Sequence, residues 1–272
     1  MNDGSAGAAA LSAVTFDLWH TLIYLDPAAE ERYFEAQVEL AARFLAPPEA
    51  ARESGGAPLD RRRSAFEASL AAAVASTRRG ESIGPGEQLT RAAGSLGVSV
   101  SVPEYLRELA DLVLHQPFRA APGASALLRE LRADGFRVGV VSNTVGEPGS
   151  ALREVLRGLD LEAPVEAFVF SDEERWSKPS PEIFWEALRR LHEPARSAVH
   201  VGDTAADIEG ARRAGFRGAI LFTGLQSYGP TYRALHAGTM DTSPAADRTV
   251  RDLADVRREI RSLLGPPRSE PG

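Results

Sequence analysis

Short apolar runs rich in valine, isoleucine and phenylalanine recur along the chain, and a polar or small residue follows each of them. They cover residues 14–16, 136–141, 167–170, 198–201 and 218–222. Between them apolar residues are spaced three and four apart, as in ASALLRELRADG, SALREVLRGLD, SPEIFWEALRRLH and DIEGARRAGF, which is typical of helices. The alternation predicts an α/β fold, a parallel sheet covered on both faces by helices with right-handed crossovers.

Residues 24–116 interrupt this alternation. They contain the helical patterns AEERYFEAQVELAARFL, RRRSAFEASLAAAVASTRR, EQLTRAAGSLG and PEYLRELADLVLHQ, with Pro/Gly-rich joints at 46–58 and 80–87. We interpret this segment as a helical cap inserted into a core made of residues 1–23 and 117–272. A simple structural bundle is the alternative, since the pattern does not show that the segment closes over a site. Residues 1–13 and 265–272 are expected to be a disordered tail and a frayed end.

The composition narrows the possible partners and cofactors. The chain has 272 residues and a net charge of −7 without a basic cluster, which argues against nucleic acid or a membrane surface as partner. The lack of cysteine excludes disulfides and thiolate metal sites. No apolar stretch reaches the ~20 residues of a membrane helix and no signal peptide is evident, so we expect a cytoplasmic protein. Small-molecule chemistry is the default, with oxygen ligands the main option for a metal.

The candidate chemistry lies where the apolar runs stop. Asp17, Ser142–Asn143 and Asp203 end three of these runs, in VTFDLW, VVSNT and HVGDT. Asp207 follows at the expected start of a helix, and Lys178 lies in the loop RWSKPSPEIF. Ligands of an open parallel sheet bind outside the carboxyl ends of its strands. We therefore expect these side chains to gather at one edge of the sheet.

The residue types in this set point to a metal and a phosphate. Three carboxylates at one small site repel one another unless a proton or a cation is present, and magnesium suits carboxylate and carbonyl ligands. A serine hydroxyl, helix N-termini and a lysine suit an anion such as phosphate, beside which a carboxylate can act as the nucleophile. Taken singly, each residue is more simply a helix cap, a turn former or a solvated charge. The whole set in this order favours a site.

The four pieces resemble the motifs of the haloacid dehalogenase (HAD) superfamily of hydrolases. FDLWHTL resembles the first motif, VVSNT the second, SKPSPEIF the third and VGDTAADIEGARRAG the fourth. The resemblance covers nearly the whole chain, because the helical insert after the first motif fits the subfamily with a helical C1 cap. It implies a Rossmann-like core, a Mg²⁺ cofactor and a small-molecule phosphate ester as substrate, hydrolysed through an aspartyl-phosphate.

The resemblance also implies a role for each residue of the set. Asp17 is expected to be the nucleophile, and Lys178 to steady both the nucleophile and the phosphate. Ser142 is expected to bind the phosphoryl oxygens, and Asn143 is a second substrate-binding candidate. The Mg²⁺ ligands would be Asp17, Asp203, the backbone carbonyl of Trp19 and, directly or through water, Asp207.

Trp19 is the departure from the family pattern. Phosphatases of the family usually carry a second aspartate at this place, which protonates the leaving oxygen and then activates water. Tryptophan offers an N–H donor and an apolar wall, but it exchanges no proton near neutral pH. His20 can titrate, although a structural role in the turn is the simpler interpretation. Thr21 would support the same turn.

The sequence leaves alternative functions open. A Mg²⁺-dependent phosphatase is favoured, because the paired acids Asp203 and Asp207 make most sense beside a cation. A 2-haloacid dehalogenase-like hydrolase using Asp17 on carbon is the enzyme alternative, since such relatives carry an aromatic residue at the place of Trp19 and work without metal. A HAD-fold binding protein with little turnover is the third. The substrate and the oligomeric state are not specified, and Arg61–Arg63 could meet a second anionic group or form a solvated helix face.

Overall fold

A computed structural model describes residues 12–46, 57–225, 227–240 and 245–263. Most of the predicted tail, the predicted frayed end at 265–272 and most of the joint at 46–58 lie outside the described residues. Ala13 is an exception within the predicted tail. It begins the first strand and is fully buried, so the tail prediction extends too far into the core.

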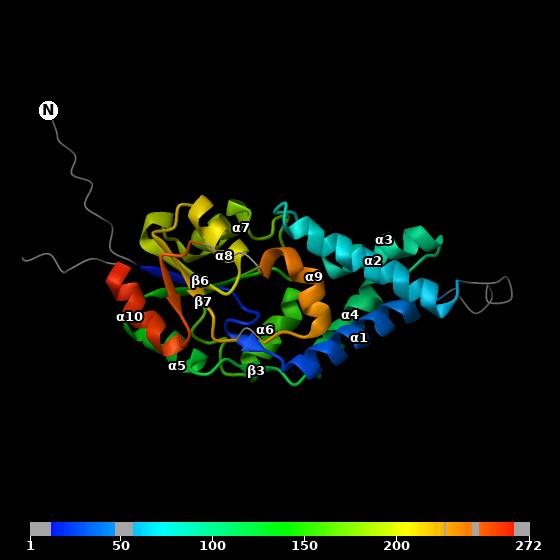
Figure 1. Cartoon of the computed structure of the whole chain (residues 1–272), viewed down its shortest axis with the longest axis horizontal. Coiled ribbons are helices and arrows are strands. Elements are labelled where there is room, and N and C mark those ends of the chain that lie inside the picture. Colours follow the sequence, from blue (N-terminus) through cyan, green and yellow to red (C-terminus); the bar gives the residue numbers. More distant parts are fainter. Residues whose placement is uncertain (1–11, 47–56, 226, 241–244, 264–272) are drawn as a thin grey trace, which may run out of the picture.

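A six-stranded parallel sheet forms the core (Figure 1). In spatial order its strands are β5 Ala167–Phe170, β4 Arg137–Ser142, β1 Ala13–Phe16, β6 Ala198–Gly202, β7 Gly218–Phe222 and β8 Arg248–Val250. Phe16 at the end of β1 pairs with Val140 of β4 and Val201 of β6. The carboxyl ends of these strands therefore lie at one edge. The predicted parallel α/β fold is confirmed.

Helices cover both faces of the sheet. One face carries α5 (Ala124–Ala133), α6 (Gly149–Gly158) and α10 (Leu253–Leu263), and the other carries α7 (Pro181–Leu191) and α8 (Ala205–Arg213). Along β1, Val14 and Phe16 belong to the apolar cluster of the first face, whereas Ala13 belongs to that of the second. This alternation is the two-residue period of a strand whose faces are both buried.

Four helices lie to one side of the sheet. In the sequence they fall between the short strands β2 (Ile23–Tyr24) and β3 (Arg119–Ala120), which pair antiparallel. They are α1 (Pro27–Phe44), α2 (Leu59–Thr77), α3 (Pro85–Leu96) and α4 (Val102–Leu114), here called the helical segment. Their ends fall within two residues of the four predicted patterns. At the start of α1, the Asp26 carboxylate accepts from the Ala29 N–H at 2.9 Å, which caps the helix. The segment has an apolar core of its own around Leu70 and Tyr105.

The sequence analysis does not predict β8, α10 or α9 (Pro230–Met240). β8 is too short and polar to stand out, with the sequence RTV. The signal for α10 is the helical spacing of Leu253, Val256 and Ile260, all of which are buried. Helix α9 packs against α1, α2 and α8, so it joins the helical segment to the core, as Figure 1 shows in orange.

Across the described part of the chain, no helix combines the length and the apolar character needed to cross a membrane. The cytoplasmic location expected from the sequence stays a prediction.

Candidate active site

The carboxylates of Asp17, Asp203 and Asp207 meet at the carboxyl edge of the sheet. One oxygen of each lies within 4.8 Å of the others. Asp17 directly follows β1, Asp203 follows β6 and Asp207 lies in the first turn of α8, so the parallel pairing of β1 with β6 brings them together. Their exposed fractions are 5%, 8% and 0%. The structure thus gathers these acids as the positions of the strand ends predict.

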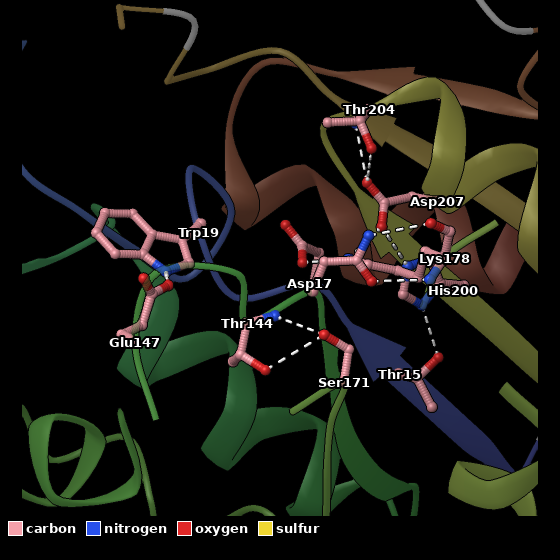
Figure 2. Close-up of polar contacts among 11 residues, drawn as sticks. Thr15, Asp17, Trp19, Thr144, Glu147, Ser171, Lys178, His200, Thr204 and Asp207 are labelled. Carbon is pink, nitrogen blue, oxygen red and sulfur yellow. Dashed lines mark hydrogen bonds and ion pairs between the residues drawn. The ribbon is translucent and has the colours of Figure 1, made fainter. Parts of the chain in front are cut away.

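Lys178, from the loop before α7, joins two of these carboxylates. Its Nζ donates to Asp17 Oδ1 and, at 2.7 Å, to Asp207 Oδ1 (Figure 2). Burial acts to lower the pKa of Lys178, but the charges of the two carboxylates outweigh burial and raise the pKa above its usual value. The ammonium group therefore stays charged and neutralises part of the negative charge of the cluster.

Asp207 is the most firmly held of the three acids. Its Oδ2 accepts from the Thr204 backbone N–H at 2.9 Å and from Thr204 Oγ1 at 2.6 Å, which forms a capping box at the start of α8. Its Oδ1 lies 3.2 Å from His200 Nε2, and His200 Nδ1 lies 2.8 Å from Thr15 Oγ1. Burial acts to raise the pKa of Asp207, but Lys178 and His200 together lower it. Asp207 is therefore ionised at neutral pH.

The sequence analysis does not predict that His200 and Thr15 hold Asp207, although two features of the sequence indicate it. Thr15 and His200 are polar residues inside the apolar runs of β1 and β6, and both are fully buried. Gly202 is a second signal, because a Cβ at this position would lie 2.3 Å from Asp207 Cγ. Only glycine leaves room for the Asp207 side chain.

Asp17 and Asp203 carry the remaining charge of the cluster. Burial and the nearby charge of Asp207 together raise the pKa of Asp17 more than Lys178 lowers it. Burial and the nearby Asp17 and Asp207 raise the pKa of Asp203 well above its usual value, although Tyr228 OH donates to Asp203 Oδ2 at 3.1 Å. Three acids facing one lysine leave an excess of negative charge at a buried site. An all-oxygen donor set with this excess fits a hard divalent cation.

Ser142 and Asn143, at the end of β4, differ in how their side chains are used. Ser142 Oγ is buried and has no hydrogen-bond partner among the described residues, so it is available to a ligand. The Asn143 amide instead bonds the Lys178 backbone twice, donating to the carbonyl at 3.0 Å and accepting from the N–H at 2.7 Å. Asn143 therefore positions the lysine, and its predicted contact with substrate stays a prediction.

Trp19 contributes a wall and a hydrogen-bond donor. Its Nε1 donates to Glu147 Oε1 at 2.6 Å. Its ring stacks on Tyr33, with centroids 6.5 Å apart, and meets the edge of Phe118 at 5.2 Å. In Figure 2 Trp19 and Glu147 lie to one side of Asp17, opposite Lys178. The role of the Trp19 backbone carbonyl as a metal ligand stays a prediction.

Glu147 is a functional candidate that the sequence analysis does not identify. It lies in the loop after β4, its exposed fraction is 7%, and burial raises its pKa to about 8. The loop is fixed at both ends, because the Thr144 N–H donates to Ser171 Oγ at 2.9 Å and the Gly149 N–H donates to Asp172 Oδ2 at 3.0 Å. A glutamate in a polar loop carries no sequence signal of burial, and its partner Trp19 is 128 residues away in the chain.

His20 and Thr21 are buried in the turn that follows Trp19. His20 has a backbone φ of 55°, its Nε2 lies 3.0 Å from Glu30 Oε1, and its ring packs on Tyr228. Neither His20 nor Thr21 is among the described residues that line the cavity at the site. These contacts support the structural interpretation of His20. Thr21 Oγ1 is buried without a hydrogen-bond partner among the described residues.

A cavity of about 140 Å³ runs from the acid cluster toward the helical segment. We call its two ends the acidic end, which includes Asp17 and Lys178, and the helical end. The helical end is walled by α1, α2, α9 and the loop that carries Glu147. The contribution of α9 could not be seen in the sequence, because it depends on how α9 packs between the core and the helical segment.

Comparisons with known proteins agree with this geometry. A model of the haloacid dehalogenase-like hydrolase family matches residues 11–215, and a HAD-hydrolase-like model matches residues 175–256. The human haloacid dehalogenase-like hydrolase domain-containing protein 3 is 38% identical over 112 residues, which cover 41% of this chain and 43% of that protein. The glyceraldehyde 3-phosphate phosphatase of Pyrococcus abyssi is 36% identical over 100 residues, covering 36% of this chain and 41% of the phosphatase. The chain thus spans about two fifths of these relatives' length.

Among solved structures, the 2-haloacid dehalogenase from Pseudomonas syringae pv. Tomato is similar over most of its length. It shares 25% identity with this chain at a TM-score of 0.58, and the match covers 93% of this chain and 98% of the dehalogenase. The similarity therefore includes both the sheet and the helical segment.

Proposed function

Because the chain belongs to the haloacid dehalogenase-like hydrolase family, we propose that it is a Mg²⁺-dependent phosphatase acting on a small phosphate monoester. The observation that carries the proposal is the buried cluster of Asp17, Asp203 and Asp207 around Lys178. Such a cluster suits a cation and a phosphate together. The name of the Pyrococcus relative, a glyceraldehyde 3-phosphate phosphatase, supports the same reaction class.

In the proposed reaction Asp17 is the nucleophile. Its carboxylate oxygen bonds to phosphorus while the bond from phosphorus to the ester oxygen breaks, and the ester oxygen leaves as an alkoxide or phenoxide that takes a proton from water. Water then hydrolyses the aspartyl-phosphate, releasing phosphate and restoring the carboxylate. Lys178 Nζ, which already bonds Asp17 Oδ1, holds the nucleophile in place and offers positive charge to the phosphoryl oxygens. The unpartnered Ser142 hydroxyl donates to one of these oxygens.

The proposed metal ligands are Asp17, Asp203, Asp207 and the backbone carbonyl of Trp19. When bound, Mg²⁺ would neutralise the charge that the acids and the phosphate bring together. Asp207 is held by Thr204 and His200, so it can orient the metal directly or through water.

Residues 24–116 are proposed to form the cap that selects the substrate. Tyr33, Leu70 and Val74, from α1 and α2, line the helical end of the cavity. A ligand bound to Asp17 would therefore contact the helical segment. This contact favours a cap over a purely structural bundle.

The second candidate is a 2-haloacid dehalogenase. Trp19 favours it, because a departing halide needs no proton, and a 2-haloacid dehalogenase matches the chain over most of its length. The crowding of Asp203 and Asp207 beside Asp17 weighs against it, since these acids need a counter-charge that a halocarbon does not provide.

Phosphate release from a panel of monoesters, and halide release from 2-haloacids, should be measured with Mg²⁺ and with excess EDTA. We expect phosphate release that stops on chelation and returns when Mg²⁺ is added. Asp203→Asn should weaken the metal and raise the Mg²⁺ concentration needed for half-maximal activity. Halide release that persists in EDTA, without phosphate release, would replace the phosphatase with the dehalogenase.

A further inference from the structure

The helical end of the cavity offers no positive charge to a ligand. Of the described residues that line the cavity, Lys178 alone carries an ammonium or guanidinium group. Its Nζ is already bonded to Asp17 and Asp207. His236 also lines the cavity, but burial lowers its pKa to about 4, so its ring is neutral near pH 7. A second anionic group on a ligand would therefore find no cation at this end.

The arginines of the helical segment lie outside the described cavity lining. Arg63 pairs with Glu35, and Arg62 donates to the Ala42 carbonyl at 2.8 Å. Arg78, at the end of α2, is exposed, and its charge helps to lower the pKa of His236. None of these three belongs to the cavity lining. None of the residues Arg61–Arg63 lines the cavity, so the alternative that they meet an anionic group of the ligand gains no support, and the alternative of a solvated helix face stays a prediction.

The charged side chains that line the helical end are acids, and neutral polar side chains such as Tyr33 and Gln37 line it as well. Glu147 accepts from Trp19 Nε1, and Glu30 Oε2 accepts from the Gly229 N–H. In either protonation state these carboxyl groups add no positive charge. The rest of the wall is largely apolar, with Phe34, Leu70, Val74 and Leu235. Moving a carboxylate or a second phosphate from water to this wall is unfavourable unless a cation pairs with it.

The size of the cavity limits the ligand as well. Its volume of about 140 Å³ includes the acidic end, which the phosphate would occupy. The whole cavity is thus no larger than the ~150 Å³ of an apolar cavity that accepts benzene. We therefore expect the organic part of the ester to be small.

We propose that the substrate is a phosphate monoester whose organic part is small, uncharged and largely apolar, and that the helical end discriminates against monoesters with a second anionic group. This inference rests on the proposed phosphatase activity. It deepens that proposal by assigning substrate selection to the charge of the cavity wall.

Phenyl phosphate and 3-carboxyphenyl phosphate form a suitable test pair, because a meta carboxylate changes the acidity of the leaving phenol little. We expect kcat/KM to be lower for the carboxylated ester by on the order of 100-fold, as for an anion placed among like charges. Equal values for the two esters, or a preference for the carboxylated one, would overturn this inference and leave the phosphatase intact. If the protein hydrolyses neither ester, both this inference and the proposed phosphatase activity are wrong.

A variant can place a cation at the helical end. Thr77 lines the cavity in the last turn of α2, where its Oγ1 donates only to the Val74 carbonyl of its own helix, at 2.7 Å. Thr77→Lys adds a positive charge that the helix C-terminus favours, and Thr77→Met is the uncharged control of similar length. The lysine variant should narrow the ratio between the two esters by about tenfold, and the methionine variant should not. An equal change of the kcat/KM ratio in both variants would contradict the electrostatic argument. If Thr77→Lys does not fold, the comparison of the two esters on the wild-type protein decides between the outcomes.

Discussion

The acidic end and the helical end of the cavity are built in different ways. The acidic end lies against the cluster of Asp17, Asp203 and Asp207, which stand after paired strands or in the first turn of a helix, so the sheet fixes their positions. The helical end is assembled from α1, α2, α9 and the loop of Glu147, which lie far apart in the sequence. Chemistry thus rests on the rigid sheet, whereas selection rests on surfaces that can change without disturbing the sheet.

Replacing the nucleophile should give the largest effect and should leave the helical end untouched. Asp17→Asn keeps the shape of the side chain but cannot attack phosphorus, so turnover should fall by on the order of 10⁴-fold or more. The melting temperature should change little, since burial already disfavours the charge of Asp17 and Lys178 keeps Asp207 as a partner. Steady-state rates and thermal melts should be compared with those of Asp60→Asn, an exposed control in the first turn of α2. Unchanged turnover in Asp17→Asn would rule out this nucleophile.

The fold and the acidic end could be predicted because they follow from local patterns. Five buried strands appear as apolar runs, and the residue after a strand such as β1 or β6 falls at the ligand-binding edge. The helical end could not be predicted, because Tyr232 and Leu235 reach the cavity only through the packing of α9 on α1 and α2. The contact of Glu147 with Trp19 likewise joins residues that are 128 positions apart in the sequence.

The second prediction concerns Trp19, which stands between the two ends. A site without an acid at this position should hydrolyse aryl phosphates, whose leaving oxygen needs little protonation, faster than alkyl phosphates by ~10²- to 10⁴-fold. The measurement is kcat/KM for phenyl phosphate and benzyl phosphate, an alkyl ester that carries the same apolar ring. Trp19→Asp should raise the alkyl activity more than the aryl activity.

The Trp19 variants need a structural control. Removing the indole opens space beside Tyr33 and Phe118 and removes the hydrogen bond that Trp19 donates to Glu147. A loss of a few kcal/mol in the free energy of unfolding is therefore expected. Trp19→Phe keeps an aromatic wall without the N–H or an acid, and it should not gain alkyl activity. If the wild type cleaves both esters equally fast, another group protonates the leaving oxygen, and Glu147→Gln is the first variant to examine.

The third prediction concerns stability at the helical end and does not involve turnover. The pKa of Glu147 rises from its usual 4.5 to about 8 in the folded protein. Below pH 4.5 the group is protonated in both the folded and the unfolded chain. Between pH 4.5 and 8 the folded chain holds a proton that the unfolded chain has lost, so the free energy of unfolding decreases as the pH rises.

Glu147→Gln removes this dependence. The melting temperature of the variant, relative to that of the wild type, should therefore rise from pH 5 to pH 8. The corresponding difference in the free energy of unfolding is about 1.4 kcal/mol for each unit of pKa shift. Thermal melts at several pH values give the comparison, with Glu67→Gln on the exposed face of α2 as the control. Parallel curves for Glu147→Gln and the wild type would show that the Glu147 pKa is not raised by folding.

The joint between the helical segment and the lysine loop bears on how such proteins can be recombined. The Ser177 N–H donates to the Gly80 carbonyl at 2.9 Å, and Ser177 Oγ donates to the Glu81 carbonyl at 2.9 Å, directly before Lys178. Gly80 has a φ of 78°, and a Cβ there would lie 2.7 Å from Ser180 Cβ. A chimera that imports the helical segment of a relative must therefore import a matching lysine loop, whose Ser177 lies 96 residues beyond Glu81 in the chain. The two parts that must be exchanged together are separate in the gene. A crossover between them would combine Lys178 with a helical segment that does not match its loop.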